Sequence, residues 1–283
     1  MKSTLLEIVI CTDCGGNYQL DGNERLVCAS CDRTIPVVGG TPLFTLPPEN
    51  INPSEKQARS PEMGTPWRQA NWRFLARQLE EISPDALILD VGAGRGDFFD
   101  GLRGRNTLAL DVYPYPEIDV VCDLTLTNPF KPGSVDVILL LNVLEHVYDS
   151  KALFGALARL LKPGGRLLVA IPFMVKMHQI PLDFVRYTHF ALEQLAADHG
   201  LEIAVLEGFY DPMFFLGEGI RNIQWPILRK MRGWRQYVGR ALLLGVRFLA
   251  HLMEPVIGPG HVRSPYEAIS LAPTGYQIVY RKK

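Results

Sequence analysis

The segment Leu87–Asp97 constrains the fold of this chain more than any other feature, because an apolar run ends there in an acid and three closely spaced glycines. It reads Leu-Ile-Leu-Asp-Val-Gly-Ala-Gly-Arg-Gly-Asp. Glycine adopts positive φ freely and lets the backbone approach a ligand closely. A strand that runs into such a turn and then into a helix marks the point where an open α/β sheet binds its ligand. We therefore expect an α/β fold with a cofactor at this turn.

Apolar runs at six other places complete the predicted sheet. Val135–Leu141 is apolar except for Asp136, as expected for the centre of a parallel sheet that is buried on both faces. The remaining strands are expected at 107–110, 118–122, 166–171, 202–210 and 275–281. Helical periodicity at 67–82 and cap residues such as Thr188 predict helices between the strands. This alternation of strands and helices is typical of a doubly wound sheet.

Composition and charge fit a globular protein with a sizeable core. Hydrophobic residues make up 47% and charged residues 21% of the 283 residues, a length that suits one large domain or one medium and one small domain. The net charge of −1 argues against a protein whose whole surface binds polyanions. The first ten residues contain Glu7 and too short an apolar run for a signal peptide, and we find no transmembrane-length apolar stretch. We therefore expect a cytoplasmic protein.

Four of the five cysteines form two C-x-x-C pairs that are separated by thirteen residues. Two such pairs in a cytosolic chain indicate a tetrahedral zinc site with four thiolate ligands. Two disulfides or a redox motif are the alternatives, and the lack of a secretion signal disfavours the disulfides. Because so short a segment cannot bury enough core by itself, the metal must supply much of its folding energy. The predicted zinc ligands are Cys11, Cys14, Cys28 and Cys31.

The glycine turn departs from the dinucleotide-binding pattern, which would need glycine where Asp97 stands. Its D-x-G-x-G-x-G form resembles the first motif of the class I S-adenosylmethionine (SAM) dependent methyltransferases. Two later segments resemble the same family: Asn142–Val147, which contains Leu-Glu-His-Val, and Leu160–Phe173, which places Lys-Pro-Gly-Gly before a strand. The resemblance covers residues 66–210. It implies a Rossmann-like, seven-stranded, mostly parallel sheet whose last two strands pair antiparallel, and it implies SAM as the cofactor.

The predicted cofactor shell follows the carboxyl ends of the first four strands. Asp111 stands nineteen residues after Gly92, close to the spacing at which an acid meets ribose hydroxyls. Asp123 follows the third strand, and the resemblance implies that it meets the adenine amino group, while a turn or cap role is the alternative. The predicted cofactor-binding residues are Asp90, Gly92, Ala93, Gly94, Gly96, Asp111, Asp123, Leu124 and Asn142.

The amino-terminal segment also resembles a known family. Residues 5–46, with the run Ile-Pro-Val-Val-Gly-Gly-Thr-Pro after the last cysteine, resemble the small zinc-ribbon activator subunit of tRNA methyltransferases. That resemblance implies a structural or docking role. We therefore divide the chain into a zinc ribbon at 1–47, a proline-rich linker at 48–66 and a methyltransferase domain at 67–283.

The acceptor side of the site is expected after the fifth strand. The segment around Asp183-Phe-Val-Arg186-Tyr-Thr resembles one that lies over the active site in many type-11 methyltransferases. There are two alternatives for Asp183. It forms an ion pair with Arg186 that fixes this loop, or it takes a proton from the acceptor. A working base needs a pKa near the operating pH. The candidate catalytic residues are His146, His178 and Asp183.

An insertion at about 211–262 separates the last two predicted strands. Within it, residues 219–253 carry seven bases and no acid, interleaved with tryptophans and aliphatic residues at helical spacing. This pattern suits a helix that lies on an anionic membrane or holds an amphiphilic substrate. RNA contact and plain packing against the sheet are the alternatives. The expected location is thus the cytoplasm, with peripheral contact to the inner face of a membrane.

Together these features predict an enzyme, a SAM-dependent methyltransferase that acts on a small or amphiphilic acceptor such as a saccharide, a lipid-linked molecule or another hydroxylated metabolite. The chain lacks the Asn-Pro-Pro-Tyr and Asp-Pro-Pro-Tyr motifs that hold exocyclic amines in amino-group methyltransferases of the resembled class. One alternative is an rRNA or tRNA methyltransferase that uses the ribbon and the basic insertion to dock RNA. Another is a non-catalytic docking module. The sequence leaves the oligomeric state open.

Overall fold

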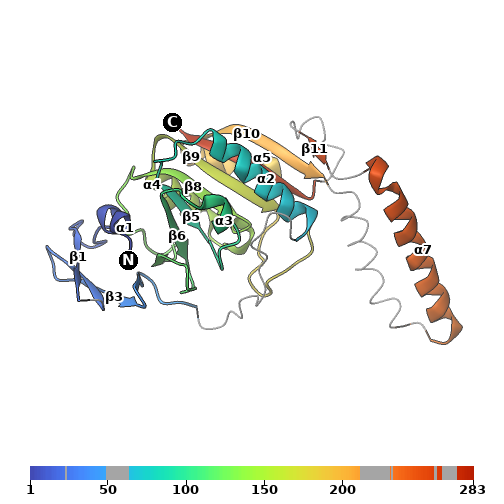
Figure 1. Cartoon of the computed structure of the whole chain (residues 1–283), viewed down its shortest axis with the longest axis horizontal. Helices are drawn as coiled ribbons and strands as arrows, with labels where there is room; N and C mark the ends of the chain where they lie inside the picture. Colours follow the sequence, from blue (N-terminus) through green and yellow to red (C-terminus); the bar gives the residue numbers. More distant parts are fainter. Residues whose placement is uncertain (23, 49–63, 211–229, 231, 258–259, 263–272) are drawn as a thin grey trace.

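The computed structural model describes the chain except for residues 23, 49–63, 211–229, 231, 258–259 and 263–272. The described parts form a small four-stranded ribbon, an eight-stranded sheet flanked by helices, and a long helix (Figure 1). The ribbon lies at one end of the large sheet, and the long helix stands apart at the other end. Most of the predicted linker at 48–66 falls outside the described residues.

The large sheet has the order β11-β10-β12-β9-β8-β5-β6-β7. Strands β5 to β9 are parallel to one another, and β12 runs antiparallel to both β9 and β10. The predicted seven-stranded, doubly wound sheet is thereby confirmed, and β11 adds an eighth strand at the edge. The bounds are β5 Ile88–Val91, β6 Thr107–Asp111, β7 Val120–Val121, β8 Val135–Leu141, β9 Leu161–Pro172, β10 Leu201–Tyr210, β11 Gly260–Val262 and β12 Gly275–Lys282.

The central strands are apolar because both of their faces are covered. Along β8, Leu139 and Leu141 belong to one buried cluster, whereas Ile138 and Leu140 belong to the other. The charged exception, Asp136, lies at the amino end of β8, where its carboxylate accepts hydrogen bonds from Leu87 N and Lys162 Nζ, each at 2.9 Å. This charge therefore lies at the opposite end of β8 from the carboxyl ends, where open α/β sheets bind their ligands.

Helices on the two faces of the sheet form the two clusters. Helices α2 (Pro66–Glu80) and α3 (Phe99–Leu102) pack on one face. Helices α4 (Ser150–Leu160) and α5 (His189–Ala197) pack on the other. The predicted cap at Thr188 is confirmed, since Thr188 Oγ1 accepts from Ala191 N at 3.3 Å, and Asp149 Oδ1 caps α4 in the same way by accepting from Ala152 N at 2.9 Å. A side-chain cap satisfies one of the free N–H groups at a helix start.

The ribbon docks on the β7 edge of the large sheet within the same chain. It consists of α1 (Ser3–Ile8) and the strands β1 (Tyr18–Asp21), β2 (Arg25–Cys28), β3 (Thr34–Val38) and β4 (Thr41–Pro42). Just after β4, Leu43 forms a parallel bridge with Val121, and Phe44 N donates to Val121 O at 2.9 Å. On the other side of the ribbon, Val9 bridges Phe130. Buried ribbon side chains belong to the same hydrophobic cluster as the sheet.

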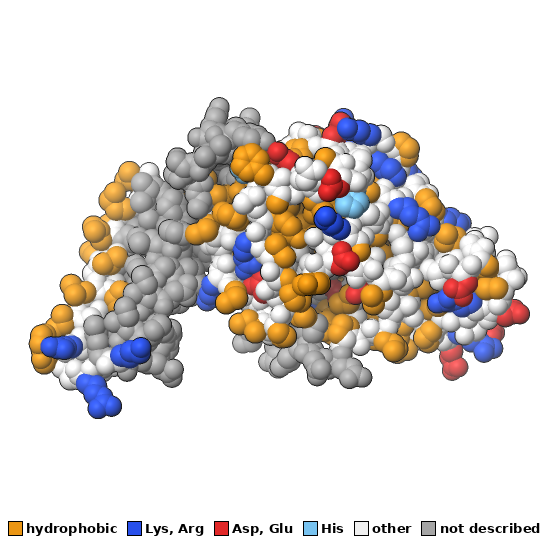
Figure 2. Space-filling model, turned by 180° about the vertical axis from the view of Figure 1, so that it is seen from behind, with side chains coloured by type: hydrophobic (Ala, Val, Ile, Leu, Met, Phe, Trp, Pro, Cys, Tyr) orange, Lys and Arg blue, Asp and Glu red, His pale blue; other side chains and the backbone are white. Residues whose placement is uncertain are grey.

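The long helix α7 (Trp234–Ile257) belongs to the predicted insertion. Figure 2 shows hydrophobic side chains along this arm and basic side chains gathered at one of its ends. The large apolar residues that are exposed on α7 are Trp234, Tyr237, Val238, Leu242, Leu244, Val246, Phe248, Leu249, Leu252, Met253 and Val256. Within the described ranges, no helix is long and apolar enough to cross a bilayer.

Candidate active site

The predicted glycine turn follows β5 and needs glycine at several positions. Gly92, Gly94 and Gly96 have φ of 72°, 57° and 83°, a region that side chains with a Cβ rarely adopt. A Cβ on Gly92 would also lie 2.5 Å from Val143 Cγ2. Ala93 is 7% exposed. The turn therefore brings its backbone against the segment that follows β8.

Asp111 at the end of β6 contacts this turn directly. Its Oδ2 accepts a hydrogen bond from Gly94 N at 2.8 Å, and its Oδ1 accepts from Tyr113 N at 2.9 Å. Burial raises the pKa of Asp111, although these backbone donors oppose the rise. The structure thus brings together two elements of the predicted cofactor shell that lie seventeen residues apart.

Asp90 is the second buried acid at this edge of the sheet. It lies at 3% exposure in β5, and its pKa rises to about 7, mainly through burial and further through the charges of Asp111 and Asp97. Asp97 forms an ion pair with Arg68 of α2. A cationic ligand bound beside these acids would stabilise their charged forms and lower their pKa.

Asp123 makes local contacts of the kind expected for a turn residue. Its Oδ1 accepts hydrogen bonds from Thr125 N at 2.9 Å and from Thr125 Oγ1 at 2.6 Å. Its backbone N donates to Thr45 Oγ1 of the ribbon at 3.0 Å. Leu124 is buried beside it at 5% exposure. These contacts match the turn alternative and leave the predicted adenine contact as a prediction.

Asn142 faces α2 through its side chain. Its Oδ1 accepts from Trp67 Nε1 at 2.8 Å and from Asn71 Nδ2 at 3.3 Å. Asn71 Oδ1 in turn accepts from Gln277 Nε2 of β12 at 2.7 Å. Asn142 has φ of 57°, so it turns the chain sharply after β8. Sequence reasoning missed Asn71 and Gln277, because only the fold brings these polar side chains to Asn142.

Three side chains meet beyond this turn, at the carboxyl ends of β8 and β9. Glu145 and His146 lie in the short 3-10 helix η1 (Leu144–His146), and His178 lies in the loop after β9. Glu145 Oε1 lies 3.6 Å from His146 Nε2 and 3.8 Å from His178 Nε2. The two imidazole rings are 4.8 Å apart and nearly perpendicular. The predicted catalytic histidines therefore share one site, which we call the Glu-His-His cluster.

Glu145 is the residue of this cluster that sequence reasoning did not select. Its side chain is fully buried, and burial raises its pKa to about 8. Burial also lowers the pKa of His146. The Leu-Glu-His-Val segment pointed to this place, but its glutamate could as well have faced solvent. Its burial became visible only in the folded chain.

Asp183 is held by a neighbouring cation. Both of its carboxylate oxygens accept hydrogen bonds from Arg186, Oδ1 at 2.5 Å and Oδ2 at 2.8 Å. Oδ2 also accepts from His178 N at 2.7 Å. The hydrogen bonds from Arg186 lower the pKa of Asp183 to about 2. A carboxylate with so low a pKa is a weak base, so the geometry favours the ion-pair role that fixes the loop around His178.

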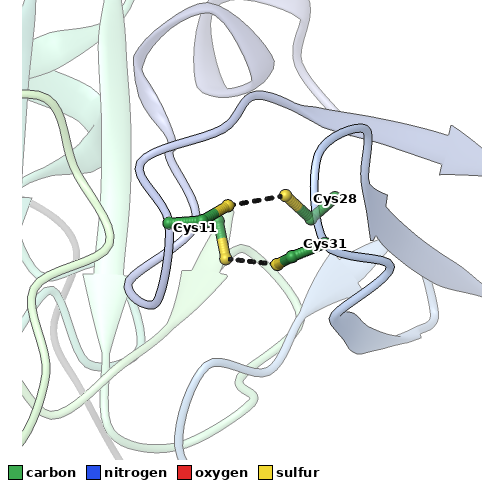
Figure 3. Close-up of side chains that lie close together, drawn as sticks. Cys11, Cys28 and Cys31 are labelled. Atoms are coloured by element: carbon green, nitrogen blue, oxygen red, sulfur yellow. Dashed lines mark hydrogen bonds between the residues drawn. The ribbon is translucent and has the colours of Figure 1, made fainter.

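The four predicted zinc ligands also come together. Figure 3 shows the sulfur atoms of Cys11, Cys28 and Cys31 turned toward one another across the ribbon. Cys11 Sγ lies 3.6 Å from Cys31 Sγ, and Cys14 Sγ lies 3.4 Å from Cys28 Sγ. All four cysteines are unbonded thiols, which contradicts the disulfide alternative. Tetrahedral zinc with bonds of about 2.3 Å would separate its sulfurs by about 3.8 Å, so the cluster fits such an ion.

The two C-x-x-C loops of the ribbon repeat one geometry. Gly15 N donates to Cys11 O at 2.8 Å, and Asp32 N donates to Cys28 O at 3.2 Å. Both Gly15 and Asp32 have positive φ, at 73° and 56°. In each loop, one cysteine sulfur also accepts a hydrogen bond from the backbone N–H two residues later. Gly16 N donates to Cys14 Sγ, and Ser30 N donates to Cys28 Sγ, each at 3.4 Å. Such bonds orient ligand sulfurs.

The strand order and the glycine turn define a class I methyltransferase fold. A family model described as "Methyltransferase domain" matches residues 65–206, about half of the chain. The chain therefore belongs to this methyltransferase family.

Individual relatives match shorter stretches. A ubiquinone biosynthesis O-methyltransferase of Xanthomonas campestris is 33% identical over 36% of this chain and 47% of its own length. A protein of Bos taurus named "Probable tRNA methyltransferase 9B" is 30% identical over 35% of this chain and 24% of its own. This chain thus spans less than half the length of these two relatives. A structure of a SAM-dependent methyltransferase from Archaeoglobus fulgidus aligns with 76% of this chain and with 94% of its own length. Its sequence identity to this chain is 15%, and the TM-score is 0.47.

Proposed function

We propose that this protein transfers a methyl group from SAM to a hydroxyl oxygen of a small or amphiphilic acceptor, such as a saccharide, a lipid-linked molecule or another hydroxylated metabolite. One observation carries the proposal: a cofactor turn and a cluster of titratable groups lie at the same edge of the sheet. Val143, which Gly92 approaches, is two residues before Glu145. A donor at the turn and an acceptor at the cluster would therefore be neighbours.

The residues at the turn fit SAM. Its sulfonium and ammonium groups are cationic, and the buried acids Asp90 and Asp111 supply the opposite charge. Asp111 extends from the strand end at which hydroxyls of a ribose would be bound. SAM supplies an already activated methyl group, so the protein mainly aligns the acceptor with it and excludes water. The proposed cofactor shell includes Ala93, Gly96, Asp123, Leu124 and Asn142 as well.

The cluster faces the acceptor in this proposal. His178 has a half-exposed side chain, whereas Glu145 is buried, so His178 is the group that an acceptor reaches first. His146 and His178 are the candidates for assisting loss of the hydroxyl proton, and Asp183 positions His178. The exposed apolar residues around this loop favour an acceptor that also carries an apolar part; they are Tyr148, Met177, Ile180 and Phe184.

Helix α7 supports an amphiphilic acceptor presented at a membrane surface. Trp234, Tyr237 and the exposed aliphatic residues of the helix would enter the apolar boundary of the bilayer. Lys230, Arg232, Arg235 and Arg240 at its amino-terminal end would meet anionic headgroups. We expect the protein to co-sediment with anionic vesicles and to lose this binding in Trp234→Ala/Tyr237→Ala. Equal recovery of the variant with the vesicles would contradict the membrane contact.

The four-cysteine cluster is proposed to hold structural zinc. Four thiolates would close the coordination shell of the ion, which leaves no position for a substrate. Zinc content should therefore be one ion per chain in the purified protein and should fall in Cys28→Ser. Retention of one equivalent in that variant would contradict the assignment.

A methyl-transfer screen tests the function as a whole. Purified protein and SAM with a labelled methyl group are incubated with lipid, saccharide and RNA fractions, and the products are identified by mass spectrometry. The proposal expects label on a hydroxyl oxygen in a lipid or saccharide fraction. Label in RNA alone would favour the RNA methyltransferase, and absence of SAM binding would favour a docking module.

A further inference from the structure

The carboxylate of Glu145 lacks a partner that its burial requires. The side chain is fully buried, and neither Oε1 nor Oε2 has a hydrogen-bond partner among the described residues. Burying an ionised carboxylate costs a great deal of free energy unless it is paired or binds a cation. His146 Nε2 is likewise buried without a hydrogen-bond partner in this part of the chain. Two unsatisfied groups therefore face each other across 3.6 Å.

Both histidines of the Glu-His-His cluster present the same nitrogen to Glu145. His146 Nδ1 lies 2.5 Å from Leu182 O, and His178 Nδ1 lies 3.2 Å from Lys176 O. A carbonyl oxygen only accepts hydrogen bonds, so each Nδ1 carries the hydrogen and each Nε2 keeps its lone pair in the neutral ring. His178 Nδ1 also lies 3.3 Å from Asp183 Oδ2. Metal-ligating histidines are oriented by such backbone and carboxylate partners.

The distances within the cluster are too long for direct hydrogen bonds and close to those of metal ligands. The gaps of 3.6 and 3.8 Å from Glu145 Oε1 to the two Nε2 atoms exceed hydrogen-bond length. One donor atom from each of the three residues lies within 4.8 Å of the others. Ligands bound about 2.1 Å from one ion lie about 3.0 to 3.4 Å apart. Small rotations of the side chains would close this difference.

We propose that Glu145, His146 and His178 bind a divalent transition-metal ion, separate from the zinc in the ribbon. Two imidazoles and one carboxylate suit Mn²⁺, Fe²⁺, Co²⁺ or Zn²⁺. Three protein ligands leave coordination positions open, as in catalytic rather than structural sites. His178 is partly exposed, with a side-chain accessibility of 32%, so the open side faces solvent.

The catalytic use of this ion rests on the proposed function. A hydroxyl acceptor would bind at an open position, where a divalent ion lowers the pKa of a bound oxygen. With the ion bound, the two imidazoles act as ligands that position it and no longer as the groups that take the hydroxyl proton, which a base from solvent takes instead. The site would thereby select acceptors whose hydroxyl reaches the ion.

Binding of Mn²⁺ tests the site without any need for activity. Full-length protein is first loaded with a single equivalent of zinc, which the four thiolates bind in preference to the Glu-His-His cluster, and Mn²⁺ is then titrated while the electron paramagnetic resonance signal of the free ion is recorded. We expect one Mn²⁺ per chain in the wild-type protein. An undiminished free signal up to millimolar Mn²⁺ would overturn the proposal.

Variants assign the binding to the cluster. Glu145→Gln keeps the shape of the side chain and should weaken Mn²⁺ binding at least tenfold, as should His178→Ala. The matched control is His199→Gln. His199 lies just before β10, whose first residue Leu201 pairs with Lys282 at the end of the sheet opposite the carboxyl ends of β8 and β9. Mn²⁺ binding should therefore be unchanged in this variant. Unaltered affinity in Glu145→Gln would reject the site. Thermal unfolding without added Mn²⁺ checks that each variant is folded.

The outcomes separate this inference from the proposed function. Mn²⁺ binding that requires Glu145, with no methyl transfer to any acceptor, would support the metal site and refute the function. Methyl transfer that persists with chelator in Glu145→Gln would support the function and refute the catalytic use of the ion, while the Mn²⁺ titration alone decides whether the site binds metal. A buried ligand predicts one further result. Without Mn²⁺, Glu145→Gln should unfold at a higher temperature than the wild-type protein. Added Mn²⁺ should stabilise only the wild-type protein and so remove this difference.

Discussion

The donor side and the acceptor side of the candidate site are built in different ways. On the donor side, β5 and β6 are hydrogen-bonded neighbours, and Asp111 contacts the glycine turn through a backbone hydrogen bond of 2.8 Å. On the acceptor side, Glu145 and His178 come from segments that follow different strands, and Glu145 Oε1 lies 3.8 Å from His178 Nε2. The first arrangement is fixed by the sheet, whereas the second depends on a loop. Changes on the donor side should therefore alter stability as well as binding, and changes in the loop on the acceptor side should alter catalysis more than stability.

The largest expected effect is a pH dependence of stability that arises on the donor side. The pKa of Asp90 rises from 3.8 to about 7 on folding, so between these values the folded chain holds a proton that the unfolded chain has lost. Stability should therefore fall as the pH rises from about 4 to about 7, by up to about 1.4 kcal/mol per pH unit. Denaturant unfolding of the protein without SAM at a series of pH values measures this slope. Asp90→Asn should reduce the slope and leave the part that the raised pKa of Glu145 contributes, and an equally steep curve would contradict the assignment.

The second effect concerns the close approach of Gly92 to Val143. Gly92→Ala adds a Cβ that would lie 2.5 Å from Val143 Cγ2, at φ of 72°. We expect a loss of about 2–4 kcal/mol in unfolding free energy. Gly104→Ala is the matched control, because Gly104 has a similar φ of 81° but no atom lies within 4 Å of its added Cβ. Val143→Ala should restore part of the stability to Gly92→Ala, and equal losses in the Gly92 and Gly104 variants would exclude the steric effect.

A third change isolates cofactor binding. Asp111→Ala removes the acid at the end of β6 and should weaken SAM about ten- to a hundredfold, as expected for loss of charged hydrogen bonds. Calorimetric titration with SAM measures the affinity. Asp123→Ala in parallel tests the alternative for that residue, since a turn role predicts little change in affinity and an adenine contact predicts a clear one. Unchanged SAM binding in Asp111→Ala would remove Asp111 from the cofactor shell.

The smallest effect on stability is expected on the acceptor side. Arg186→Gln frees Asp183, so the orientation of His178 is lost while the sheet remains intact. Methyl transfer should fall about tenfold, as for the loss of an outer partner of a functional histidine, with SAM affinity unchanged. Arg77→Gln, which breaks the ion pair with Glu207 on the surface, should leave both quantities unchanged. A parallel loss of SAM affinity in Arg186→Gln would show that the two sides are not independent.

The same contrast explains how much could be predicted from the sequence. Strands such as Val135–Leu141 agree with prediction, because continuous apolar runs report burial on both faces. The third strand is shorter than predicted, since only Val120 and Val121 pair with β6. The glycine turn and the four cysteines depend on residue types at short spacing, so the sequence shows them. For these features the chemistry is local.

Other features depend on contacts that no spacing encodes. The cofactor contact of Asn142 stays a prediction, and no spacing could show that its side-chain oxygen accepts hydrogen bonds from Trp67 and Asn71, in a helix about seventy residues earlier. Glu145 had no distinguishing signal beyond its motif, because the sequence cannot tell which face of a short helix is buried. The docking of the ribbon on β7 was also beyond prediction, since backbone groups of Phe44 and Val121 form it.

The docked ribbon has a consequence for how the protein behaves outside its folded state. An exposed edge strand offers unpaired backbone groups to any other chain and promotes aggregation. Here the segment around Leu43 covers the β7 edge, and we propose that structural zinc in the cysteine cluster helps to hold that segment in place. We therefore expect chelation of zinc to cause self-association before it causes unfolding of the large sheet. Under the proposal of structural zinc, metal supply would then govern the solubility of the protein.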